Sequence, residues 1–367
     1  MVLMGTARAE DLLSGGSMQS FRSVKHWHTV AEVAAAPDET ALSAKGQGSM
    51  LLNGGEKNTG IPFLLTKGEY GDVKVELEFM IPLGSNAGVY LMGRYEVQIL
   101  DSFGKKEVNA GDLGGIYQRY DASRPKGQQG FEGTAPRVNA AKAPGEWQTM
   151  EIIFRAPRFD EAGQKQKDAL FEKVMVNGAV VQENATTSGP TRSAAYEGDA
   201  PRGPIAIQGD HGPIAIRKFH VTSLDPVDQR RVAEIDAYWK TVSRAVNEGD
   251  FEAYRATCHS EGVLVSGNKR MTQPLSAALA RWKQEFVDTK EGKMKASVVF
   301  RFSRRLGDAT TAHETGIFRY ESQRTGAPAV VEYVRFEALL VKRQDAWQIV
   351  MENQQESASE DAWKALE

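Results

Sequence analysis

Hydrophobic and polar residues alternate along residues 86–103, which predicts a β-strand with one buried face. The hydrophobic positions of one parity are typical of a core. The opposite parity places Arg94, Glu96 and Gln98 in a row. A cation, a carboxylate and an amide are an unusual set for a solvent-facing strand surface. We therefore expect this face to line a groove the size of a sugar, with the first domain built around it.

Similar alternation recurs over the first two-thirds of the chain. Residues 73–79 alternate in the same way and predict a second strand. We expect this strand to pair with that of residues 86–103 through the turn at 82–86. That pairing would bring Glu76 or Glu78 near the polar row, although a solvent-exposed ladder of ion pairs is the simpler interpretation of these two glutamates. A short helix is expected over residues 30–36.

Turn and loop signals separate these strands. Residues 104–145 are rich in glycine and proline, and such a long irregular stretch inside a domain predicts a rim or lid over the groove. Asn177-Gly178 predicts a tight hairpin, and a last strand is expected over residues 214–224. Many short strands with turn punctuation predict a β-sandwich of jelly-roll type over residues 20–224.

The pattern changes at Asp225-Pro226. The spacing of hydrophobic residues then predicts one apolar helix face, made of Val232, Ile235, Trp239, Val242 and Val246. Asp250 is placed to cap a second helix. A third helix and four long strands, up to residue 354, follow. This order predicts an α+β domain with helices packed on a curved sheet. The predicted organisation is an N-terminal arm (1–19), the jelly-roll domain (20–224), a linker (225–230) and the α+β domain (231–360).

Composition narrows the classes of function. The chain has 367 residues and a formal charge of −3, with scattered basic residues and no field that favours nucleic acid. Cys258 is the only cysteine, so an intramolecular disulfide and a cysteine-based zinc site are excluded. No segment approaches the roughly 20 apolar residues of a membrane span.

The N-terminus suggests export. Ala7-Arg8-Ala9 follows a short apolar run and has the small-x-small form of a signal-peptidase site. We interpret residues 1–19 as the remnant of a secretory signal, whose start lies upstream, and an N-terminal arm. The alternative is an arm alone. Export predicts a periplasmic or secreted protein rather than a cytoplasmic one.

Several ordered motifs of the first domain carry a resemblance to a known family. They are Asn86-Ala-Gly-Val-Tyr90, Gly93-Arg-Tyr-Glu-Val-Gln-Ile-Leu-Asp-Ser102, Pro144-Gly-Glu-Trp147, Phe154-Arg-Ala-Pro-Arg-Phe159, Asn177-Gly178, Gly189-Pro-Thr191 and Gly203-Pro-Ile-Ala-Ile-Gln-Gly-Asp-His-Gly212. With them the domain resembles the bacterial 3-keto-disaccharide (3-keto-glycoside) hydrolases, which have a concanavalin-like jelly roll. The resemblance implies a glycoside-cleaving enzyme acting on 3-keto-glycosides.

The second domain resembles the cone-shaped fold of nuclear transport factor 2 (NTF2) and SnoaL-type cyclases. Asn247-Glu-Gly-Asp250 and Val263-Leu-Val265 carry this resemblance. The fold hosts enzymes, binders and dimerisation modules. Core packing is the default interpretation of Trp239, Tyr254 and Tyr333, but with His259 and His313 they could instead line a cone-shaped pocket. Ligand binding and homodimer formation through this domain are the alternatives for its role.

A ketone at C3 of a sugar makes the C2 proton acidic. A base can remove this proton, the C1 substituent then leaves by elimination, and water adds to the enone. Glu96 is the leading candidate for the base because it lies mid-strand beside an apolar core. His211 is the alternative acid or base, since its pKa lies near neutrality, and Asp210 either orients His211 or stays exposed.

The other candidates would bind substrate. Arg94 is placed to hold a substrate oxygen or the enolate. Hydroxyl groups are matched by the amides of Gln98 and Asn86, and Tyr117 could stack on a sugar ring. Asp101, a third candidate catalytic group, has the wrong parity and reaches the groove only through a bulge. Its alternative role is to cap the following turn.

Two points stay open at the level of sequence. A divalent metal is compatible with a carboxylate and a histidine from separate strands, but no ligand spacing demands one. A non-catalytic carbohydrate-binding module, fused to a dimerising or small-ligand-binding domain, is the alternative to an enzyme. The two hypotheses differ at Glu96 and His211, because a lectin needs no titratable base.

Overall fold

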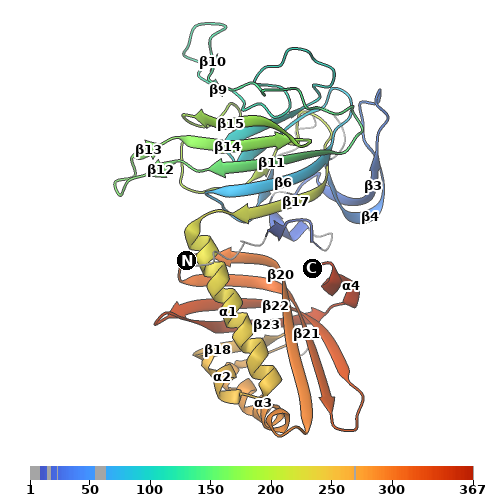
Figure 1. Cartoon of the computed structure of the whole chain (residues 1–367), viewed down its shortest axis with the longest axis vertical. Helices are drawn as coiled ribbons and strands as arrows, with labels where there is room; N and C mark the ends of the chain where they lie inside the picture. The colour runs from blue at the N-terminus through green and yellow to red at the C-terminus, as the bar shows by residue number, and fades with distance from the viewer. Residues whose placement is uncertain (1–8, 15–17, 23, 54–62, 268–269, 367) are drawn as a thin grey trace. The chain divides into compact units, whose positions relative to one another are not determined.

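A computed structural model describes residues 9–14, 18–22, 24–53, 63–267 and 270–366 of the chain. The chain divides into two compact units, Asp11–Asp225 and Pro226–Glu367 (Figure 1). Each unit has its own hydrophobic core. Strands dominate the first unit, and the second combines helices with a single sheet. The predicted mainly β class, a sandwich followed by an α+β domain, is confirmed.

The larger sheet of the first unit forms one layer of the sandwich. Its strand order in the described part of the chain is β15-β14-β11-β6-β17-β4-β3, and β1 (Glu10–Asp11) pairs with β17. The bounds are β3 His28–Ala34, β4 Ser43–Leu52, β6 Val73–Met80, β11 Gln148–Arg155, β14 Ala169–Val176, β15 Ala179–Thr187 and β17 Ala215–Ser223. Alternate residues of these strands are buried, as in β6 and β11, because one face covers the core.

The smaller sheet forms the second layer. Its order is β2-β5-β16-β7-β8, with bounds β2 Phe21–Arg22, β5 Leu64–Thr66, β7 Asn86–Leu91, β8 Tyr95–Leu100 and β16 Ala206–Ile207. Side chains of both sheets meet in one core. Tyr95 of β8 and Phe154 of β11, for example, have ring centroids 5.5 Å apart. Such interdigitation of two sheet faces is what holds a β-sandwich together.

The prediction of a single strand over residues 86–103 is wrong, because this stretch forms a hairpin. β7 and β8 pair antiparallel, and the chain reverses through Met92, Gly93 and Arg94. Met92 and Gly93 have φ values of 57° and 66°, a left-handed conformation that is rare for methionine and easy for glycine. The turn escaped the sequence analysis because the hydrophobic alternation continues across it.

The expected pairing of residues 73–79 with this region is also wrong. β6 lies between β11 and β17 in the larger sheet, while β7 belongs to the smaller one. Glu76 forms ion pairs with Lys74 and Lys218, at 3.5 and 3.4 Å, and Glu78 with Arg217, at 2.6 Å. The ladder of ion pairs, which was the simpler interpretation of these glutamates, is confirmed.

The remaining local predictions have mixed outcomes. Residues 30–36, expected as a helix, lie mainly in β3, because pairing with β4 prevails over the local propensity. Asn177 and Gly178 make the predicted hairpin turn between β14 and β15, with φ values of 48° and 84°. The segment after β8 is largely irregular, as predicted, and contains the short pair β9 (Arg119–Tyr120) and β10 (Gly130–Phe131). A second short pair, β12 (Arg158–Phe159) and β13 (Lys165–Lys167), follows β11.

The second unit begins with α1 (Pro226–Glu248), so most residues of the expected linker lie in this helix. Asp250 caps α2 (Phe251–Ala256) as predicted, because its carboxylate accepts a hydrogen bond of 3.0 Å from the Ala253 N–H. The sheet order in the described residues is β19-β18-β23-β22-β21-β20. Its bounds are β18 Cys258–Ser266, β19 Met271–Pro274, β20 Met294–Gly307, β21 Thr311–Arg324, β22 Val330–Arg343 and β23 Ala346–Ser357.

Helices cover both faces of this sheet. α1 and α3 (Leu275–Lys290) pack over one face, where Ile235, Trp239 and Val242 of α1 are buried, as their spacing predicted (Figure 1). The short α4 (Glu360–Lys364) places Trp363 on Ile317 at the opposite face. The sheet therefore has a sheltered face, over which α1 to α3 lie, and an outer face partly covered by α4.

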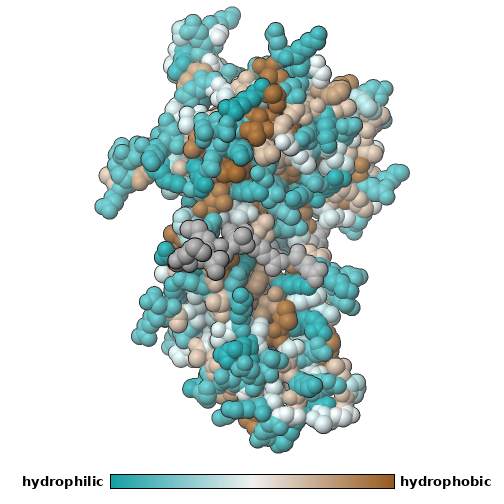
Figure 2. Space-filling view, in the orientation of Figure 1, coloured by the Kyte–Doolittle hydropathy of each residue, from teal (hydrophilic) through white to brown (hydrophobic). Residues whose placement is uncertain are grey.

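Polar side chains dominate the molecular surface in Figure 2, and hydrophobic residues gather on the visible face in separate small groups. Within the described residues, no helix combines the length and the apolar character needed to cross a membrane. Residues 1–8, which carry most of the expected signal remnant, lie outside the described part of the chain.

Candidate functional site

The hairpin of β7 and β8 brings the polar positions of residues 86–98 together on the outer face of the smaller sheet. Register pairs Tyr90 with Glu96 and Gly88 with Gln98. Residues of the other parity, such as Val89 and Val97, are completely buried in the sandwich core. The predicted alternation of β8 is therefore confirmed for Glu96 and Gln98, which share the face turned away from the core. At 1% and 5% exposure these side chains are covered by other residues, so they do not line the open groove that was expected.

Glu96 is the most unusual group on this face. It is 1% exposed, and among the described residues neither carboxyl oxygen has a hydrogen-bond partner of ordinary geometry. The pKa of Glu96 is raised to about 8. Burial is the main cause, the neighbouring Tyr90 hydroxyl acts in the opposite direction, and the negative charge of Asp210 adds to the rise. A buried carboxyl group without partners is costly, and such groups are enriched at functional sites.

Tyr90 and Gly88 lie next to the Glu96 side chain. Neither residue was predicted from the sequence as part of the site. The Tyr90 hydroxyl donates a hydrogen bond of 3.4 Å to the Arg192 carbonyl, and burial raises the pKa of Tyr90 far above its ordinary value. Gly88 lies beneath the Glu96 carboxyl group, where a side chain would overlap it. Recognition of the turn at Gly93 would have placed both residues opposite the polar row.

Asp210 and His211 lie in the loop that follows β16. The Gln208 N–H donates to the Gly88 carbonyl at 2.9 Å, which ties this loop to β7. His211 Nδ1 and Asp210 Oδ1 are 2.6 Å apart, and both side chains are about half exposed. Asp210 is close enough for its charge to act on Glu96. The loop thus places an acid–imidazole pair at the rim of the Glu96 site.

Arg94 is not part of the strand that carries Glu96. It belongs to the turn before β8, where its Nε donates to the Gly198 carbonyl at 2.7 Å and its Nη1 to the Met92 carbonyl at 2.9 Å. Its guanidinium group also lies 5.2 Å from the ring centroid of Tyr196. The structure therefore uses Arg94 to hold a neighbouring loop, and the expected row of three polar side chains is reduced to Glu96 and Gln98.

Asp101 is also separate from the site. Its carboxylate accepts hydrogen bonds from the N–H groups of Gly84, at 2.9 Å, and Phe103, at 3.3 Å. It therefore caps the adjoining turns, which was its alternative role. The pairing of β7 with β8 is regular up to Leu100, so this pair contains no bulge of the kind that Asp101 would need to reach the groove.

Tyr117 lies beside the Glu96 backbone, whereas Asn86 lies further along the hairpin, opposite Leu100. Asn86 has the parity of Gly88 and Tyr90 on β7, and its buried Oδ1 has no hydrogen-bond partner in the part of the chain that the structure describes. The Tyr117 N–H donates to the Glu96 carbonyl at 3.1 Å, so the irregular segment after β8 runs along the free edge of that strand. Asn86 thus offers an unused acceptor on the same face as Glu96.

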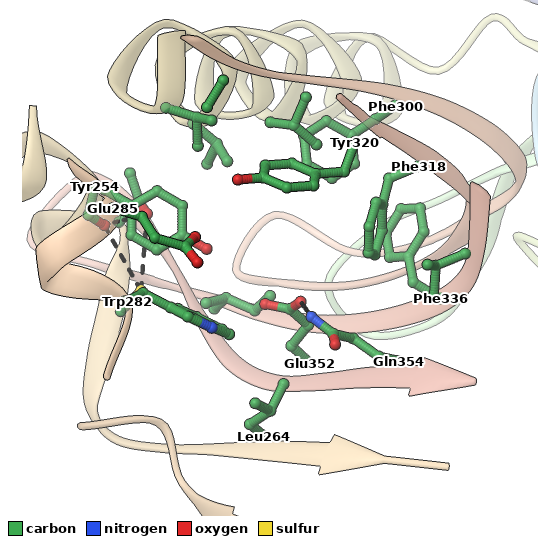
Figure 3. Close-up of a pocket in the computed structure, with 18 of the residues that line it drawn as sticks. Tyr254, Leu264, Trp282, Glu285, Phe300, Phe318, Tyr320, Phe336, Glu352 and Gln354 are labelled. Atoms are coloured by element: carbon green, nitrogen blue, oxygen red, sulfur yellow. Dashed lines mark hydrogen bonds between the residues drawn. The ribbon is translucent and has the colours of Figure 1, made fainter. Parts of the chain in front are cut away.

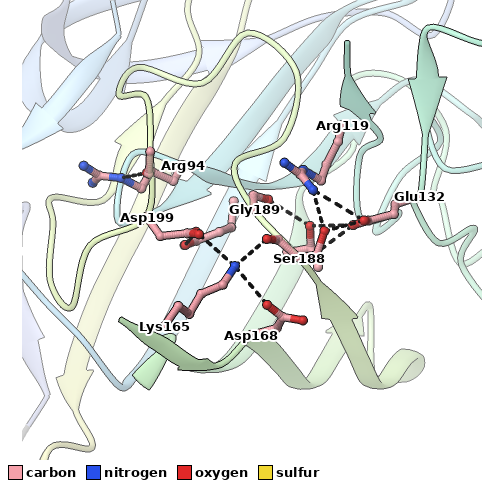
Figure 4. Close-up of polar contacts among 11 residues, drawn as sticks. Arg94, Arg119, Glu132, Lys165, Asp168, Ser188, Gly189 and Asp199 are labelled. Carbon is pink, nitrogen blue, oxygen red and sulfur yellow. Dashed lines mark hydrogen bonds and ion pairs between the residues drawn. The ribbon is translucent and has the colours of Figure 1, made fainter. Parts of the chain in front are cut away.

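The segment Ser188–Asp199 contacts the site from the other side. The Glu96 N–H donates to Thr191 Oγ1 at 3.1 Å. Figure 4 shows how side chains from distant parts of the chain hold this segment. Lys165 pairs with Asp199 at 2.8 Å, and Arg119 donates to the hydroxyl group of Ser188. We call Ser188–Asp199 the covering segment.

The described residues contain no complete set of ligands for the divalent metal considered in the sequence analysis. Among the residues that the structure describes, no three His, Cys, Asp or Glu side chains are grouped so that they could hold an ion. The pair of Asp210 and His211 supplies two donors of the kind envisaged for a divalent metal.

Comparison with known proteins identifies the first unit. Residues 9–222 match the family described as the 3-keto-alpha-glucoside-1,2-lyase-like domain, and the chain belongs to this family. No curated protein sequence matches the chain. The family points to a glycoside-related function.

Solved structures similar to the chain fall into two groups. A candidate glycosyl hydrolase from Parabacteroides distasonis is 26% identical, and the match covers 59% of this chain and 84% of that one, with a TM-score of 0.42. An NTF2-like protein from Shewanella oneidensis is 19% identical over 34% of this chain and 99% of its own, and a ketosteroid isomerase-like protein from Erwinia carotovora is 18% identical over 35% and 97%. Both have a TM-score of 0.28 and cover the C-terminal part.

Proposed function

We propose that the first unit cleaves 3-keto-glycosides, with Glu96 as the base that removes the C2 proton. The electron pair of the C–H bond forms an enolate toward the C3 ketone, and its collapse expels the C1 substituent. Water then adds to the resulting enone. The observation that supports this proposal is the buried, unpartnered carboxyl group of Glu96 in a chain of this family.

The raised pKa of Glu96 suits this chemistry. A carboxylate with a pKa of about 8 holds a proton more tightly than an ordinary glutamate, so it is a stronger base toward a weakly acidic C–H bond. The Tyr90 hydroxyl group and the amide of Gln98 lie on the same face and are suited to donate to the C3 oxygen and to sugar hydroxyl groups.

We assign protonation of the leaving oxygen to His211, with Asp210 as the group that orients its ring. Their 2.6 Å contact fixes the imidazole at the rim, where the leaving part of the substrate would depart to solvent. Because Glu96 is 1% exposed, productive binding includes displacement of part of its surroundings. The covering segment, which contacts both Tyr90 and Glu96, is the part that we expect to move.

Incubation of the full chain with 3-keto-disaccharides of both anomeric linkages tests this function, with chromatography of the released sugars. Turnover in D2O should also place deuterium at C2, which reports proton abstraction directly. Glu96→Gln should lower kcat by about 10²–10⁴-fold. Glu78→Gln, which alters an exposed ion pair on the other sheet, is the matched control and should keep full activity.

Binding without turnover by the wild-type chain would overturn the proposal and favour a carbohydrate-binding module. Turnover without deuterium at C2 would reject the assigned chemistry while leaving a glycosidase. Export to the periplasm or medium and homodimerisation through the second unit stay predictions, to be tested by cell fractionation and by light scattering of the purified chain.

A further inference from the structure

The second unit encloses a cavity of about 400 Å³ between the sheltered face of its sheet and helices α1 to α3. Aromatic rings make up much of its wall, and six of them are Trp239, Tyr254, Trp282, Phe300, Phe318 and Phe336. Figure 3 shows the labelled rings around one open space. Of the five residues that were candidates for a pocket, Trp239 and Tyr254 line this cavity, whereas His259, His313 and Tyr333 do not. This volume is typical of sites for small organic molecules.

The carboxyl group of Glu352 faces this aromatic space. Glu352 of β23 receives a hydrogen bond of 2.6 Å from Gln354 Nε2 to its Oε1. Within the described residues, no further donor reaches this carboxyl group, and no basic side chain forms an ion pair with it. Burial raises the pKa of Glu352, and the hydrogen bond from Gln354 only partly offsets this effect. The group is therefore a strong and incompletely satisfied acceptor.

The rest of the lining is also acidic. Glu285 of α3 and Glu332 of β22 are exposed lining residues, and Figure 3 shows Glu285 and Tyr320 pointing toward each other. Arg281 is the only basic residue among the described lining residues, and it is exposed and lies over the Trp282 ring, 5.9 Å from the centroid. Three carboxyl groups against one guanidinium group favour a positive charge inside.

We propose that this cavity binds a small organic cation, an amine attached to an aromatic or other apolar ring system. The amine would pair with Glu352 and donate to its unsatisfied oxygen, while the ring system packs among the aromatic side chains. Cations also interact favourably with the faces of such rings, especially when water is excluded. An anion would meet the Glu352 carboxylate with no cation to compensate, and a neutral molecule would gain no charge pairing.

Three probes with one skeleton separate these possibilities: 2-(1-naphthyl)ethylamine, 2-(1-naphthyl)ethanol and 1-naphthaleneacetate. We expect calorimetric titration of the full chain to show that the amine binds at least tenfold more tightly than the alcohol, and that the acetate does not bind. Equal affinity for amine and alcohol, or tighter binding of the acetate, would overturn the proposal. These measurements do not depend on glycoside cleavage by the first unit.

The variant Glu352→Gln tests the residue itself. Its affinity for the amine should fall at least tenfold, to the level of the alcohol, while binding of the alcohol shows that the cavity is intact. Glu356→Gln, which removes an exposed charge from the same strand, is the control and should bind the amine as the wild type does. If the glutamine variant does not fold, Glu352→Asp, which withdraws the carboxylate by one methylene group, should weaken binding of the amine selectively. Unchanged amine affinity in a folded Glu352 variant would reject the proposal.

Discussion

The carboxyl group of Glu96 rests on Gly88 of the paired strand. A Cβ atom added to Gly88 would overlap Glu96 Oε1 and crowd its Cδ and Cγ atoms, but it would meet no backbone atom among its nearest neighbours. The absence of a side chain at residue 88 therefore makes room for the carboxyl group of Glu96 in particular. Glu96 and Gly88 therefore depend on each other, although only Glu96 is ionisable.

Gly88→Ala is expected to displace Glu96 without disrupting the sheet. The flexible end of a side chain can move more easily than a strand, so the thermal unfolding temperature should change little. Cleavage of a 3-keto-disaccharide should fall about 100-fold, because a small misplacement of a catalytic group is expensive. A variant with unchanged activity and stability would contradict the placement of Glu96.

The pH dependence of cleavage should report the ionisation of Glu96. A base acts in its deprotonated form, so kcat/KM should rise with pH and level off above a pKa of about 8. Glu78→Gln should show the same profile as the wild type. A profile that is already flat above pH 5 would indicate a base with an ordinary carboxyl pKa and would exclude Glu96 from this role.

The ionisation of Glu96 should also affect stability. Loss of its proton, which activates the proposed base, should destabilise the native state. The native state keeps a proton on Glu96 up to pH about 8, whereas the unfolded chain loses it near pH 4.3, so wild-type stability should fall between these values as pH rises. The slope contributed by one such proton is about 1.4 kcal/mol per pH unit. Urea titrations from pH 5 to pH 9 should therefore show that the free energy of unfolding of Glu96→Gln rises relative to that of the wild type up to pH 8. A constant difference would refute the raised pKa.

Arg94 is expected to act by positioning the covering segment. Arg94→Leu removes the bonds to Gly198 and Met92, so KM should rise about tenfold while kcat changes less. Limited proteolysis should then cut within Ser188–Asp199 faster than in the wild type. Arg137→Leu, which removes an exposed pair with Glu183, is the control. A variant that loses kcat alone would point instead to direct contact with the reacting atoms.

Asp72 should be a stability residue of the first unit. Its carboxylate accepts hydrogen bonds from Arg158, at 2.7 Å, and from the buried Ala156 N–H, at 3.0 Å. Burial acts to raise the pKa of Asp72, but these bonds and the nearby arginine charges lower it on balance. Asp72→Ala should therefore lower the free energy of unfolding by about 1–3 kcal/mol at neutral pH.

The sign of the Asp72 effect can be checked against acid. A lowered pKa contributes stability above the unfolded value of about 3.9, and this contribution is lost as pH falls through the native pKa. Wild type and variant should converge below that range, as measured by urea titration. A difference that is equally large at pH 2 would mean that packing, and not the charge of Asp72, is responsible.

Much of this fold follows from short-range patterns. The spacing of Ile235, Trp239 and Val242 predicts the buried face of α1, and Asn177-Gly178 predicts the hairpin of β14 and β15. Each of these two signals lies within a short stretch of sequence, so the local chemistry is sufficient to predict the element. The long strands of the second unit are predictable for the same reason.

Partners that are distant in sequence could not be predicted in this way. The turn at Met92-Gly93 carries no strong turn residue at its first position. When this turn is overlooked, the alternation carries Arg94 into the polar row of Glu96. The tie between Arg94 and Gly198 spans 104 residues and follows no spacing rule. Parity alone identified Glu96 and Gln98, whereas Tyr90 and Gly88 required knowledge of the hairpin register.

The covering segment has a consequence for how this family can diversify. It contains no helix or strand, and anchors such as Arg94, Arg119 and Lys165 lie on other parts of the unit. Its interior can therefore change in length and chemistry while the two sheets keep their packing. We expect sequence differences among relatives to concentrate between these anchors. For the proposed cleavage of 3-keto-glycosides, grafting of this stretch is then the shortest route to a changed sugar preference.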